Sequence, residues 1–295
     1  MKKIGVIGAG AMGKGLAKNL SLNGNDVTAY KRKIDPEDEV IKYLKENNVK
    51  ITDDLNKIFS ESEVLVTCVS DSPTMEKLFI QKGGFVDIKE SKVEVVIDFT
   101  TALPESTQKI AKVLLEKGVE MLDSPMTGGP NQADQGKVRL AIGGKKEIFE
   151  KYKNLLENVS AFMIYAGEIG SAHTIKLFNN FLAALSLTAS SGVVALAEKL
   201  DVDLEAMHAY INGGGGRSWG FDTLMNKIFS GNYKDNYFAL KLAFKDVGYN
   251  KEVFKELGSF AILETLFNTM QEAMDEGYGD EDLSSMYFSL KEKMR

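Results

Sequence analysis

The stretch Gly8-Ala9-Gly10-Ala11-Met12-Gly13 decides the fold of this chain. An apolar run, Lys3–Ile7, precedes it, and a helical pattern, Lys14–Asn23, follows it. In a G-x-G-x-x-G sequence between a strand and a helix, the first glycine permits a tight turn, the second lets the backbone approach a pyrophosphate, and the third lets the helix pack on the strand. We therefore predict that a nicotinamide dinucleotide binds to Gly8, Gly10, Ala11, Met12 and Gly13. A glycine turn that only connects strand and helix is the alternative.

Three cations directly follow the next expected strand, Asp26–Tyr30. In NAD-specific sites an Asp or Glu usually stands here and accepts hydrogen bonds from the ribose hydroxyls, whereas a guanidinium can bind a 2′-phosphate bidentately. Here Lys31, Arg32 and Lys33 come first, and the first acid, Asp35, comes later. The sequence therefore favours NADP(H) over NAD(H), with an ordinary solvated charge run as the alternative.

Apolar strands alternate with helical patterns through the first half of the chain. Near-continuous apolar runs are typical of strands that a parallel sheet buries on both faces. The expected strands are Lys3–Ile7, Asp26–Tyr30, Val64–Val69, Val93–Asp98, Glu120–Asp123, Leu140–Ile142 and Ala161–Tyr165, with helices that include Pro73–Phe79 and Glu105–Lys117. These patterns predict an α/β Rossmann domain, with a doubly wound and mainly parallel sheet, over residues 1–166.

From residue 167 onward the patterns are helical only. A long helix is expected over His173–Lys199, rich in Ala, Ser and Leu, and its small residues would let other helices approach closely. No proline follows Pro130, which agrees with uninterrupted helices. The sequence therefore predicts an all-α second domain over residues 167–295 that begins with this long helix.

The composition is that of an ordinary globular protein, 44% hydrophobic and 26% charged over 295 residues. A single cysteine, Cys68, cannot form an internal disulfide, which fits a reducing cytoplasm. We find neither a signal peptide nor a run of about 18 apolar residues that would predict a membrane span. The net charge of −6 argues against a nucleic-acid partner. No cluster has metal-ligand spacing. We expect a cytoplasmic protein that binds no metal, nucleic acid or membrane.

Four separated signatures in order resemble the β-hydroxyacid dehydrogenase family, which includes 3-hydroxyisobutyrate dehydrogenases and tartronate semialdehyde or glyoxylate reductases. The first is the stretch from Gly5 to Gly13 with Asn19-Leu20. The others are Asp123-Ser124-Pro125-Met126-Thr127-Gly128-Gly129 with Gly143-Gly144, then Gly167-x-x-Gly170 with Lys176 to Asn180, and finally Lys245-Asp246. In this family the position of Thr127 is commonly Ser, so its hydroxyl is kept. The resemblance covers essentially the whole chain.

The resemblance implies that Lys176 is the catalytic acid/base. Oxidising a hydroxy acid requires a base for the hydroxyl proton, a group that holds the carboxylate, and a hydride acceptor, which the cofactor supplies. A lysine base needs its pKa lowered from about 10.4 toward neutrality, and both desolvation and a cationic nicotinamide act in that direction. A surface helix lysine is the alternative. His173, one turn earlier, could tune the site, but the family chemistry does not need it, and we interpret it as a polar residue at the start of the helix.

Further site residues follow from the same resemblance. Asn180 lies one turn after Lys176 and would bind the substrate and orient the lysine, unless it is a satisfied core amide. A hydroxyl and backbone N–H groups in one turn are suited to a carboxylate, so we expect the substrate to bind Thr127, Gly128 and Gly129, with a plain turn as the alternative.

The remaining candidates would contact the cofactor. Lys245 would lie near the nicotinamide, with Asp246 holding the local geometry, although a solvated helix face is the alternative. Ligands bind at the carboxyl ends of the strands in such sheets, and Val69, Ser70 and Thr101 follow two of these ends. The resemblance implies that Thr101 contacts the nicotinamide side of the cofactor.

The leading hypothesis is an NADP-dependent oxidoreductase that interconverts a short 3-hydroxy acid and its semialdehyde, of the 3-hydroxyisobutyrate, tartronate semialdehyde, glyoxylate or succinic semialdehyde type. The family picture also implies a homodimer or homotetramer and a small carboxylate substrate. An imine reductase of the same architecture typically lacks the lysine at position 176, and a non-catalytic NADP-binding sensor or scaffold should have lost it too. The exact substrate, the physiological direction, the oligomer size and the role of the Gly213–Trp219 loop stay open.

Overall fold

The computed structural model describes residues 1–233, 238–255, 257–258 and 260–294. Contacts divide the chain into two compact units, Met1–Lys176 and Leu177–Arg295, and each unit is described by itself. The division lies later than the domain boundary that we expected after residue 166. The reason is that the first turns of the long helix α8 (Ser171–Lys199) pack within the first unit, where Ala172 and His173 are completely buried.

The first unit is built on one sheet of nine strands, in the order β3-β2-β1-β4-β5-β6-β8-β7, with β9 paired to β8. The strands from β3 to β6 are parallel, β8 runs antiparallel to β6 and β7, and β9 is parallel to β8. Their bounds are β1 Lys3–Ile7, β2 Asp26–Tyr30, β3 Lys50–Thr52, β4 Val64–Thr67, β5 Val95–Asp98, β6 Glu120–Asp123, β7 Met126–Thr127, β8 Val138–Gly143 and β9 Ser160–Gly167. Because parallel strands end on the same side, β1, β2, β4, β5 and β6 share one end of the sheet, which we call the carboxyl edge.

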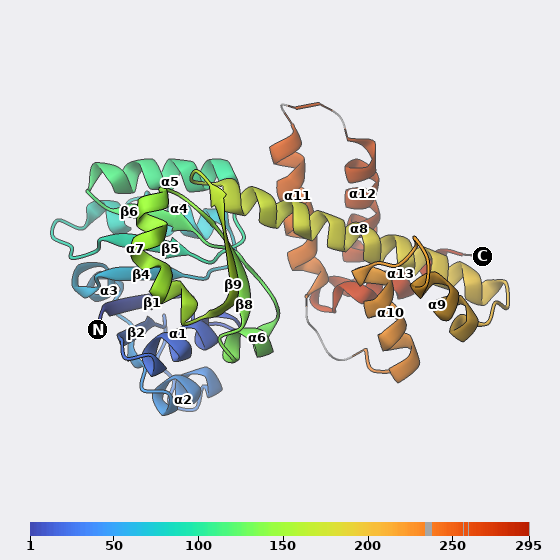
Figure 1. Cartoon of the computed structure of the whole chain (residues 1–295), viewed down its shortest axis with the longest axis horizontal. Helices are drawn as coiled ribbons and strands as arrows, with labels where there is room; N and C mark the ends of the chain where they lie inside the picture. Colours follow the sequence, from blue (N-terminus) through green and yellow to red (C-terminus); the bar gives the residue numbers. More distant parts are fainter. Residues whose placement is uncertain (234–237, 256, 259, 295) are drawn as a thin grey trace. The chain divides into compact units, whose positions relative to one another are not determined.

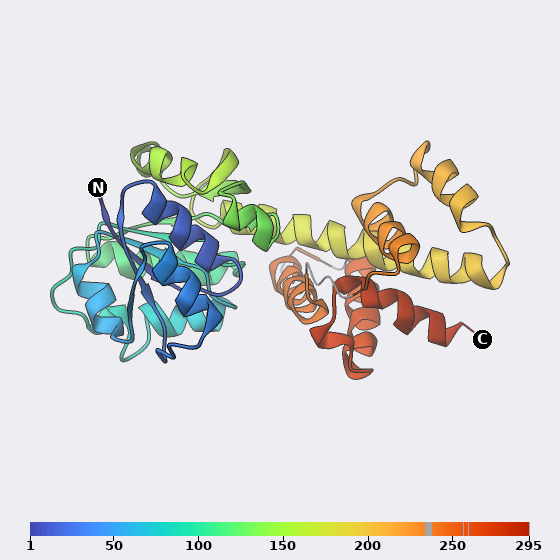
Figure 2. The same cartoon turned by 90° about the horizontal axis from the view of Figure 1, so that it is seen from below.

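Helices cover both faces of this sheet (Figures 1 and 2). One apolar core lies under α1, α2, α6 and α7, and a second lies under α3, α4 and α5. These helices span α1 Gly13–Leu22, α2 Glu39–Glu46, α3 Leu55–Glu61, α4 Ser72–Phe79, α5 Pro104–Glu116, α6 Pro130–Asp134 and α7 Lys146–Glu157, with a short 3-10 turn, η1, at Phe85–Asp87. The predicted doubly wound α/β class is therefore confirmed.

The second unit is helical in its described residues, with a single isolated bridge between Ala239 and Asp282. Helices α9 to α13 gather around the part of α8 that follows Leu177 (Figure 1). Gly220 permits one close approach, because a Cβ there would lie 2.3 Å from the Leu187 nitrogen of α8. The bounds are α9 Leu204–Asn212, α10 Trp219–Ser230, α11 Leu240–Phe254, α12 Ala261–Asp275, η2 Tyr278–Asp280, η3 Leu283–Ser285 and α13 Met286–Lys293.

Helix α8 is both long and strongly apolar. Its length and its mean hydropathy of 1.6 over an 18-residue window would suffice for a membrane span, although 56% of that window is buried within the protein. A core helix of a globular protein passes the same test, so this feature is weak evidence for a membrane span.

Candidate functional site

The glycine turn between β1 and α1 requires its glycines for space as well as conformation. Gly8 has a φ of +97°, and a Cβ there would lie 2.2 Å from the carbonyl oxygen of Cys68. A Cβ on Gly13 would lie 2.1 Å from the carbonyl oxygen of Gly8. Gly10 differs, because its Cβ position has no atom within 4 Å. Gly8 and Gly13 therefore fix the turn, while Gly10 leaves open space beside it.

Unsatisfied backbone donors point out of the same turn. Gly10 N–H donates to Gly8 at 2.8 Å and Lys14 N–H donates to Gly10 at 3.0 Å. In the described structure the N–H groups of Ala11, Met12 and Gly13 donate to no protein acceptor. Together with the positive end of the α1 dipole, these donors suit a pyrophosphate. The turn thus fits the nicotinamide dinucleotide that its sequence predicts.

The three cations after β2 differ in their surroundings. Lys31 Nζ lies 3.3 Å from Asp38 Oδ2. The same carboxylate accepts hydrogen bonds from two N–H groups in the first turn of α2. Burial alone would raise the pKa of Asp38, but these bonds and the Lys31 charge lower it overall. Arg32 and Lys33 are exposed. The charge of Lys31 is therefore largely balanced, and Arg32 is the cation best placed to meet a 2′-phosphate.

Val69, Ser70 and Thr101 lie beyond the ends of β4 and β5, at the carboxyl edge. Val69 N–H donates to Thr100 Oγ1 at 3.1 Å, so the nitrogen of Val69 is already used. The Ser70 hydroxyl lies 2.8 Å from Asp71 Oδ2 in the turn that begins α4. Thr101 is half-buried and directly follows Thr100. These segments are thus tied to one another at the edge where a cofactor is expected.

The Thr127–Gly129 turn leads from β7 into α6. Gly128 has a φ of +125°, and Gly129 N–H donates to Gln132 Oε1 at 2.9 Å. The nitrogen of Gly129 is therefore not available to a carboxylate as the sequence suggested. The Thr127 hydroxyl and Gly128 N–H remain as donors in this turn, since no bond from either is found in the described structure.

Asn19 explains why its position belongs to the first family signature. Its Nδ2 donates to Ala133 and Asp134 carbonyl oxygens of α6, both at 3.0 Å, and to Gly15 within α1 at 2.8 Å. Gly15 permits this packing, because a Cβ there would lie 2.6 Å from the carbonyl carbon of Ala133. The helix of the cofactor turn and the helix after the Thr127 turn are therefore joined by one side chain.

The start of α8 is anchored at the end of β6. Asp123 is completely buried and accepts hydrogen bonds from Gly170 N–H and His173 N–H, both at 2.9 Å. A carboxylate at this position satisfies helix N-terminal donors and opposes the helix dipole. Lys176 follows on the second turn of α8 and is half-buried. The lysine thus emerges from a helix whose first turn is fixed at the carboxyl edge.

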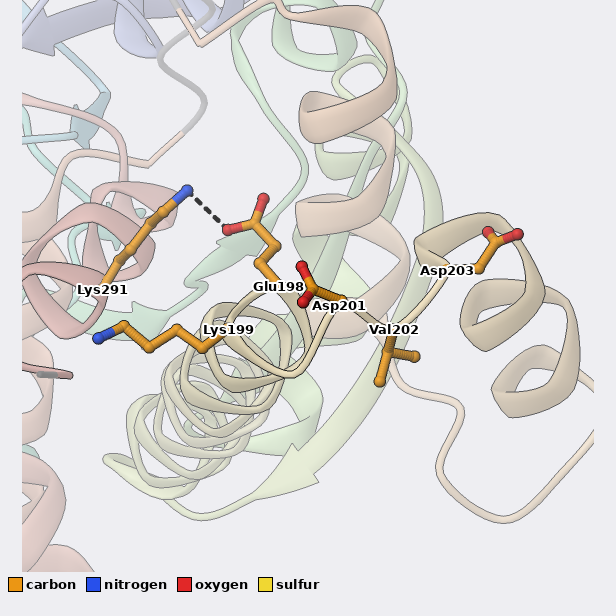
Figure 3. A pocket seen from close by; sticks show the side chains of 6 residues that line it. All are labelled: Glu198, Lys199, Asp201, Val202, Asp203 and Lys291. Atoms are coloured by element: carbon orange, nitrogen blue, oxygen red, sulfur yellow. Dashed lines mark ion pairs between the residues drawn. The ribbon is translucent and has the colours of Figure 1, made fainter.

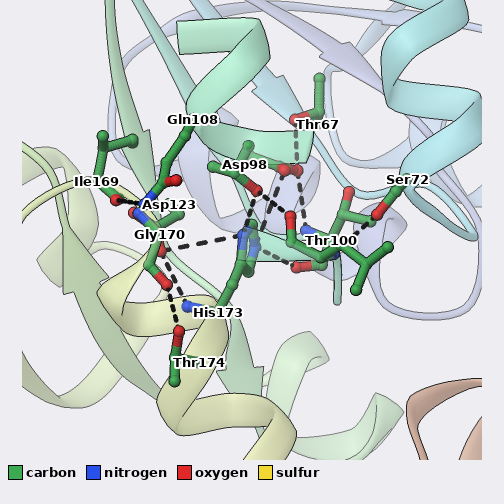
Figure 4. A network of polar contacts seen from close by, with 12 residues as sticks. Thr67, Ser72, Asp98, Thr100, Gln108, Asp123, Ile169, Gly170, His173 and Thr174 are labelled. Atoms are coloured by element: carbon green, nitrogen blue, oxygen red, sulfur yellow. Dashed lines mark hydrogen bonds and ion pairs between the residues drawn. The ribbon is translucent and has the colours of Figure 1, made fainter. Parts of the chain in front are cut away.

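His173 lies in the first turn of α8, as the sequence indicated, but the sequence analysis did not name it as a site residue. Its side chain has no solvent exposure and both ring nitrogens have partners (Figure 4). Asp98 and Asp123, which surround it, were also not singled out as site residues. The sequence did hold one signal, because each acid ends a strand directly after two or three apolar residues.

Three of the candidate residues meet within the second unit. Asn180 is buried, and its Nδ2 donates to Asp246 Oδ2 at 2.6 Å. Lys245 Nζ lies 3.1 Å from the other oxygen of the same carboxylate. Asn179 donates to Asn180 Oδ1 at 3.0 Å, so that oxygen is also used. Asp246 therefore orients both Asn180 and Lys245, and one N–H of the Asn180 amide is left for a ligand.

Two surface hollows lie away from all of these residues. One, at the C-terminal end of α8, is lined by Glu198, Lys199, Asp201, Val202, Asp203 and Lys291 (Figure 3). Its Glu198 and Lys291 form an ion pair of 2.6 Å. The other lies at the amino ends of β1 to β3, opposite the carboxyl edge. Among the described residues, no group of His, Cys, Asp or Glu could hold a metal ion.

Two family models match the chain in succession. The model of the NAD binding domain of 6-phosphogluconate dehydrogenase matches residues 3–167. The model described as NAD-binding of NADP-dependent 3-hydroxyisobutyrate dehydrogenase matches residues 170–290.

Individual relatives extend over nearly the whole chain. The 2-(hydroxymethyl)glutarate dehydrogenase of Eubacterium barkeri is 29% identical over 287 residues, which cover 96% of this chain and 93% of the relative. The mitochondrial 3-hydroxyisobutyrate dehydrogenase of Mus musculus is 26% identical, with 98% and 87% covered. In fold, the chain is similar to the Mycobacterium tuberculosis 3-hydroxyisobutyrate dehydrogenase solved with L-serine (TM-score 0.86, 20% identity, 99% of each chain). It is also similar to an imine reductase from Myxococcus stipitatus in complex with NADP+ (TM-score 0.64, 19% identity, 98% and 100% covered).

A Rossmann unit with a dinucleotide turn, followed by a helical unit that the second model matches, defines an NAD(P)-dependent oxidoreductase. The chain belongs to the β-hydroxyacid dehydrogenase family and is an NAD(P)-dependent hydroxyacid dehydrogenase.

Proposed function

We propose that this chain interconverts a short 3-hydroxy acid and its semialdehyde with NADP(H), and that Lys176 is the general acid/base. One observation carries the proposal. The first turn of α8 is bound to Asp123 at the end of β6, so Lys176 follows from the same carboxyl edge that carries the cofactor turn. The acid/base acts on the substrate oxygen and the hydride carrier acts on the carbon that bears it. Both groups must therefore start from the same end of the sheet.

Each remaining role can be assigned to a named group of this chain. The nicotinamide, when bound, supplies the hydride acceptor or donor. In the oxidation direction the neutral amine of Lys176 takes the hydroxyl proton, and in the reduction direction its ammonium returns a proton to the carbonyl oxygen. The second N–H of Asn180 would donate to a substrate oxygen, because Asp246 occupies the first. The Thr127 hydroxyl and Gly128 N–H would hold the carboxylate.

The preference for NADP(H) rests on the end of β2. A 2′-phosphate would meet the exposed guanidinium of Arg32, with Lys33 beside it. No carboxylate directly follows β2 to bind the ribose hydroxyls or to repel a phosphate, because the first acid after this strand is Asp35. Asp38, further on, pairs with Lys31 and caps α2. Charge-assisted bidentate pairing with phosphate is a role for which arginine is well suited.

The substrate class follows from the relatives only in outline. A 2-(hydroxymethyl)glutarate dehydrogenase and a 3-hydroxyisobutyrate dehydrogenase are both among them. We include 3-hydroxyisobutyrate, tartronate semialdehyde, glyoxylate and succinic semialdehyde as candidate types. All four are short molecules with one carboxylate, which is what one turn with two donors can hold.

We also propose that the active form is a homodimer or homotetramer in the cytoplasm. Leu182, Ala189 and Leu196 follow one another at intervals of seven residues on α8 and are all exposed. A seven-residue repeat of exposed apolar side chains is typical of a helix that pairs with another helix. Leu196→Glu should therefore lower the mass measured by light scattering, whereas the exposed Lys153→Glu should not. An unchanged mass for Leu196→Glu would contradict this interface.

The deciding experiment is a panel of 3-hydroxy acids and semialdehydes, together with cyclic imines, each assayed with NADP(H) and with NAD(H). We expect turnover of a short 3-hydroxy acid or its semialdehyde and a preference for NADP(H). Turnover of imines alone, or of no member of the panel while NADPH still binds, would refute the proposed reaction. A preference for NAD(H) would refute the role of Arg32.

A further inference from the structure

A buried polar network centred on His173 joins four segments at the carboxyl edge (Figure 4). The imidazole Nε2 lies 2.8 Å from the Thr100 carbonyl oxygen, and Nδ1 lies 2.8 Å from the Thr107 hydroxyl of α5. Asp98 Oδ2, at the end of β5, lies 3.9 Å from Nε2. Asp123 Oδ2, at the end of β6, lies 3.9 Å from Nδ1. The ring therefore connects the loop after β5 with α5, β6 and the first turn of α8.

The hydrogen bonds determine which ring nitrogen matters for the loop. A carbonyl oxygen can only accept, so Nε2 must carry the hydrogen that Thr100 receives. The Thr107 hydroxyl also lies 3.1 Å from the Leu103 carbonyl oxygen, so it can donate its hydrogen to Nδ1 or donate it to Leu103 and accept from an Nδ1–H. The bond from Nε2 to Thr100 is thus the obligatory one, and the bond to Thr107 is adaptable.

Thr100 has little freedom once this bond is made. Its N–H donates to Asp98 Oδ1 at 3.0 Å, its hydroxyl accepts from Val69 N–H at 3.1 Å, and its carbonyl accepts from His173. Asp98 Oδ1 is held in turn by the Thr67 hydroxyl at 2.8 Å. Every polar group of Thr100 is therefore fixed, and the next residue is Thr101, the candidate contact of the nicotinamide.

We propose that His173 is a positioning residue that sets Thr101 and Lys176 in register with each other. One side chain holds the backbone directly before Thr101, while its own backbone N–H is bound to Asp123 and its helix carries Lys176 one turn later. The inference rests on the proposed function, since it concerns the same acid/base. It adds that the geometry of hydride and proton transfer depends on a residue that touches neither substrate nor cofactor.

Two substitutions of His173 distinguish the role of Nε2 from that of Nδ1. In His173→Gln the amide nitrogen is as many bonds from Cβ as Nε2, so it can still donate to Thr100. In His173→Asn the amide nitrogen corresponds to Nδ1, so the bond to Thr107 can form and the bond to Thr100 is lost. Thr107→Val is the matched control, because it removes a buried partner of the same ring and leaves the bond from Nε2 to Thr100.

We expect His173→Asn to lower kcat about 10- to 100-fold, since small misplacements of reacting groups have effects of this size. The dissociation constant of NADPH, read by its fluorescence, should change less than about threefold, because the phosphate contacts lie on the β1–α1 turn and after β2. The deuterium isotope effect with C4-labelled NADPH should rise as hydride transfer becomes rate-limiting. His173→Gln and Thr107→Val should keep kcat within about threefold of the parent.

The outcomes distinguish this inference from the proposed function. If the parent turns over its substrate and folded His173→Asn retains its kcat and isotope effect, His173 is only structural and the inference fails. If His173→Asn and Thr107→Val lose activity in proportion to their loss of thermal stability, the inference also fails. If the parent turns over nothing in the substrate panel, the proposed function is refuted, and this inference falls with it.

Discussion

Replacing Arg32 by alanine tests how the chain selects its cofactor. Arg32 is exposed at the end of β2, and Lys31 beside it is paired with Asp38 at 3.3 Å. A hydrogen bond to a charged group contributes about 1.5–3 kcal/mol, and solvent exposure reduces the value of a bidentate pair toward the lower part of that range. A loss of about 1.4–2.8 kcal/mol corresponds to NADPH binding that is weaker by about 10- to 100-fold.

The structure also predicts that Lys31 contributes less to NADPH affinity than Arg32 does. Lys31→Ala should weaken NADPH binding less than about threefold, because Asp38 already balances the charge of Lys31 and surface pairs contribute little. Binding of NADH, which lacks the 2′-phosphate, should change in neither variant. The affinity of the parent for NADPH should fall with added salt, and this salt dependence should be smaller in Arg32→Ala.

Fluorescence titration of each variant with NADPH and NADH, at low and at physiological ionic strength, measures these differences. Lys153→Ala, which removes an exposed cation outside this segment, is the matched control. The reasoning is refuted if Arg32→Ala binds NADPH as the parent does, or if it loses NADPH and NADH affinity equally. A larger effect from Lys31 than from Arg32 would also contradict it, since the ion pair with Asp38 would then not limit Lys31.

Three further changes have sharp expected outcomes. Lys176→Ala should abolish turnover while NADPH binding stays nearly intact, and near-normal turnover would contradict the assignment of the acid/base. Gly13→Ala should prevent NADPH binding, because its Cβ would lie 2.1 Å from the carbonyl oxygen of Gly8, and a titration that matches the parent would exclude the turn as the cofactor site. Lys227→Met should lower the free energy of unfolding by about 3 kcal/mol, since it leaves the buried Asp282 without its partner at 2.9 Å. Burial raises the pKa of Asp282, but Lys227 and Ser284 lower it overall. The stability from this carboxylate is therefore present at neutral pH and is lost as pH falls below the ordinary Asp value of 3.8 toward the folded pKa, so parent and variant should converge in acid unfolding curves.

Much of the first unit could be predicted from local patterns. The strands Lys3–Ile7 and Asp26–Tyr30 are found with the expected bounds, because apolar runs that end at glycine or charge mark buried parallel strands clearly. The strand Lys50–Thr52 was missed, since it is a three-residue edge strand without an apolar run. Met126–Thr127 was missed because a two-residue strand is defined by its pairing with β8 and not by its own sequence.

The residues of the candidate site could be predicted from the sequence, but the hydrogen bonds and ion pairs between them could not. The sequence pointed to Asn180 and Asp246, but the 2.6 Å bond between them joins residues that lie far apart in the chain. The partner of Lys31 stands at the start of α2, and no local pattern shows that its carboxylate turns back toward the lysine. The burial of His173 could not be predicted for the same reason, because it comes from β5, β6 and α5 and not from its neighbours in sequence.

Helix α8 carries Lys176 and Asn180 on successive turns, and the sequence from Ser171 to Ser191 contains neither glycine nor proline. An unbroken α-helix advances about 1.5 Å and turns about 100° per residue, so the spacing of these two side chains is set by the helix itself. Natural variation can reshape the Thr127 turn or the loop before Trp219 without altering that pair, whereas the insertion of a single residue between Lys176 and Asn180 would rotate one away from the other.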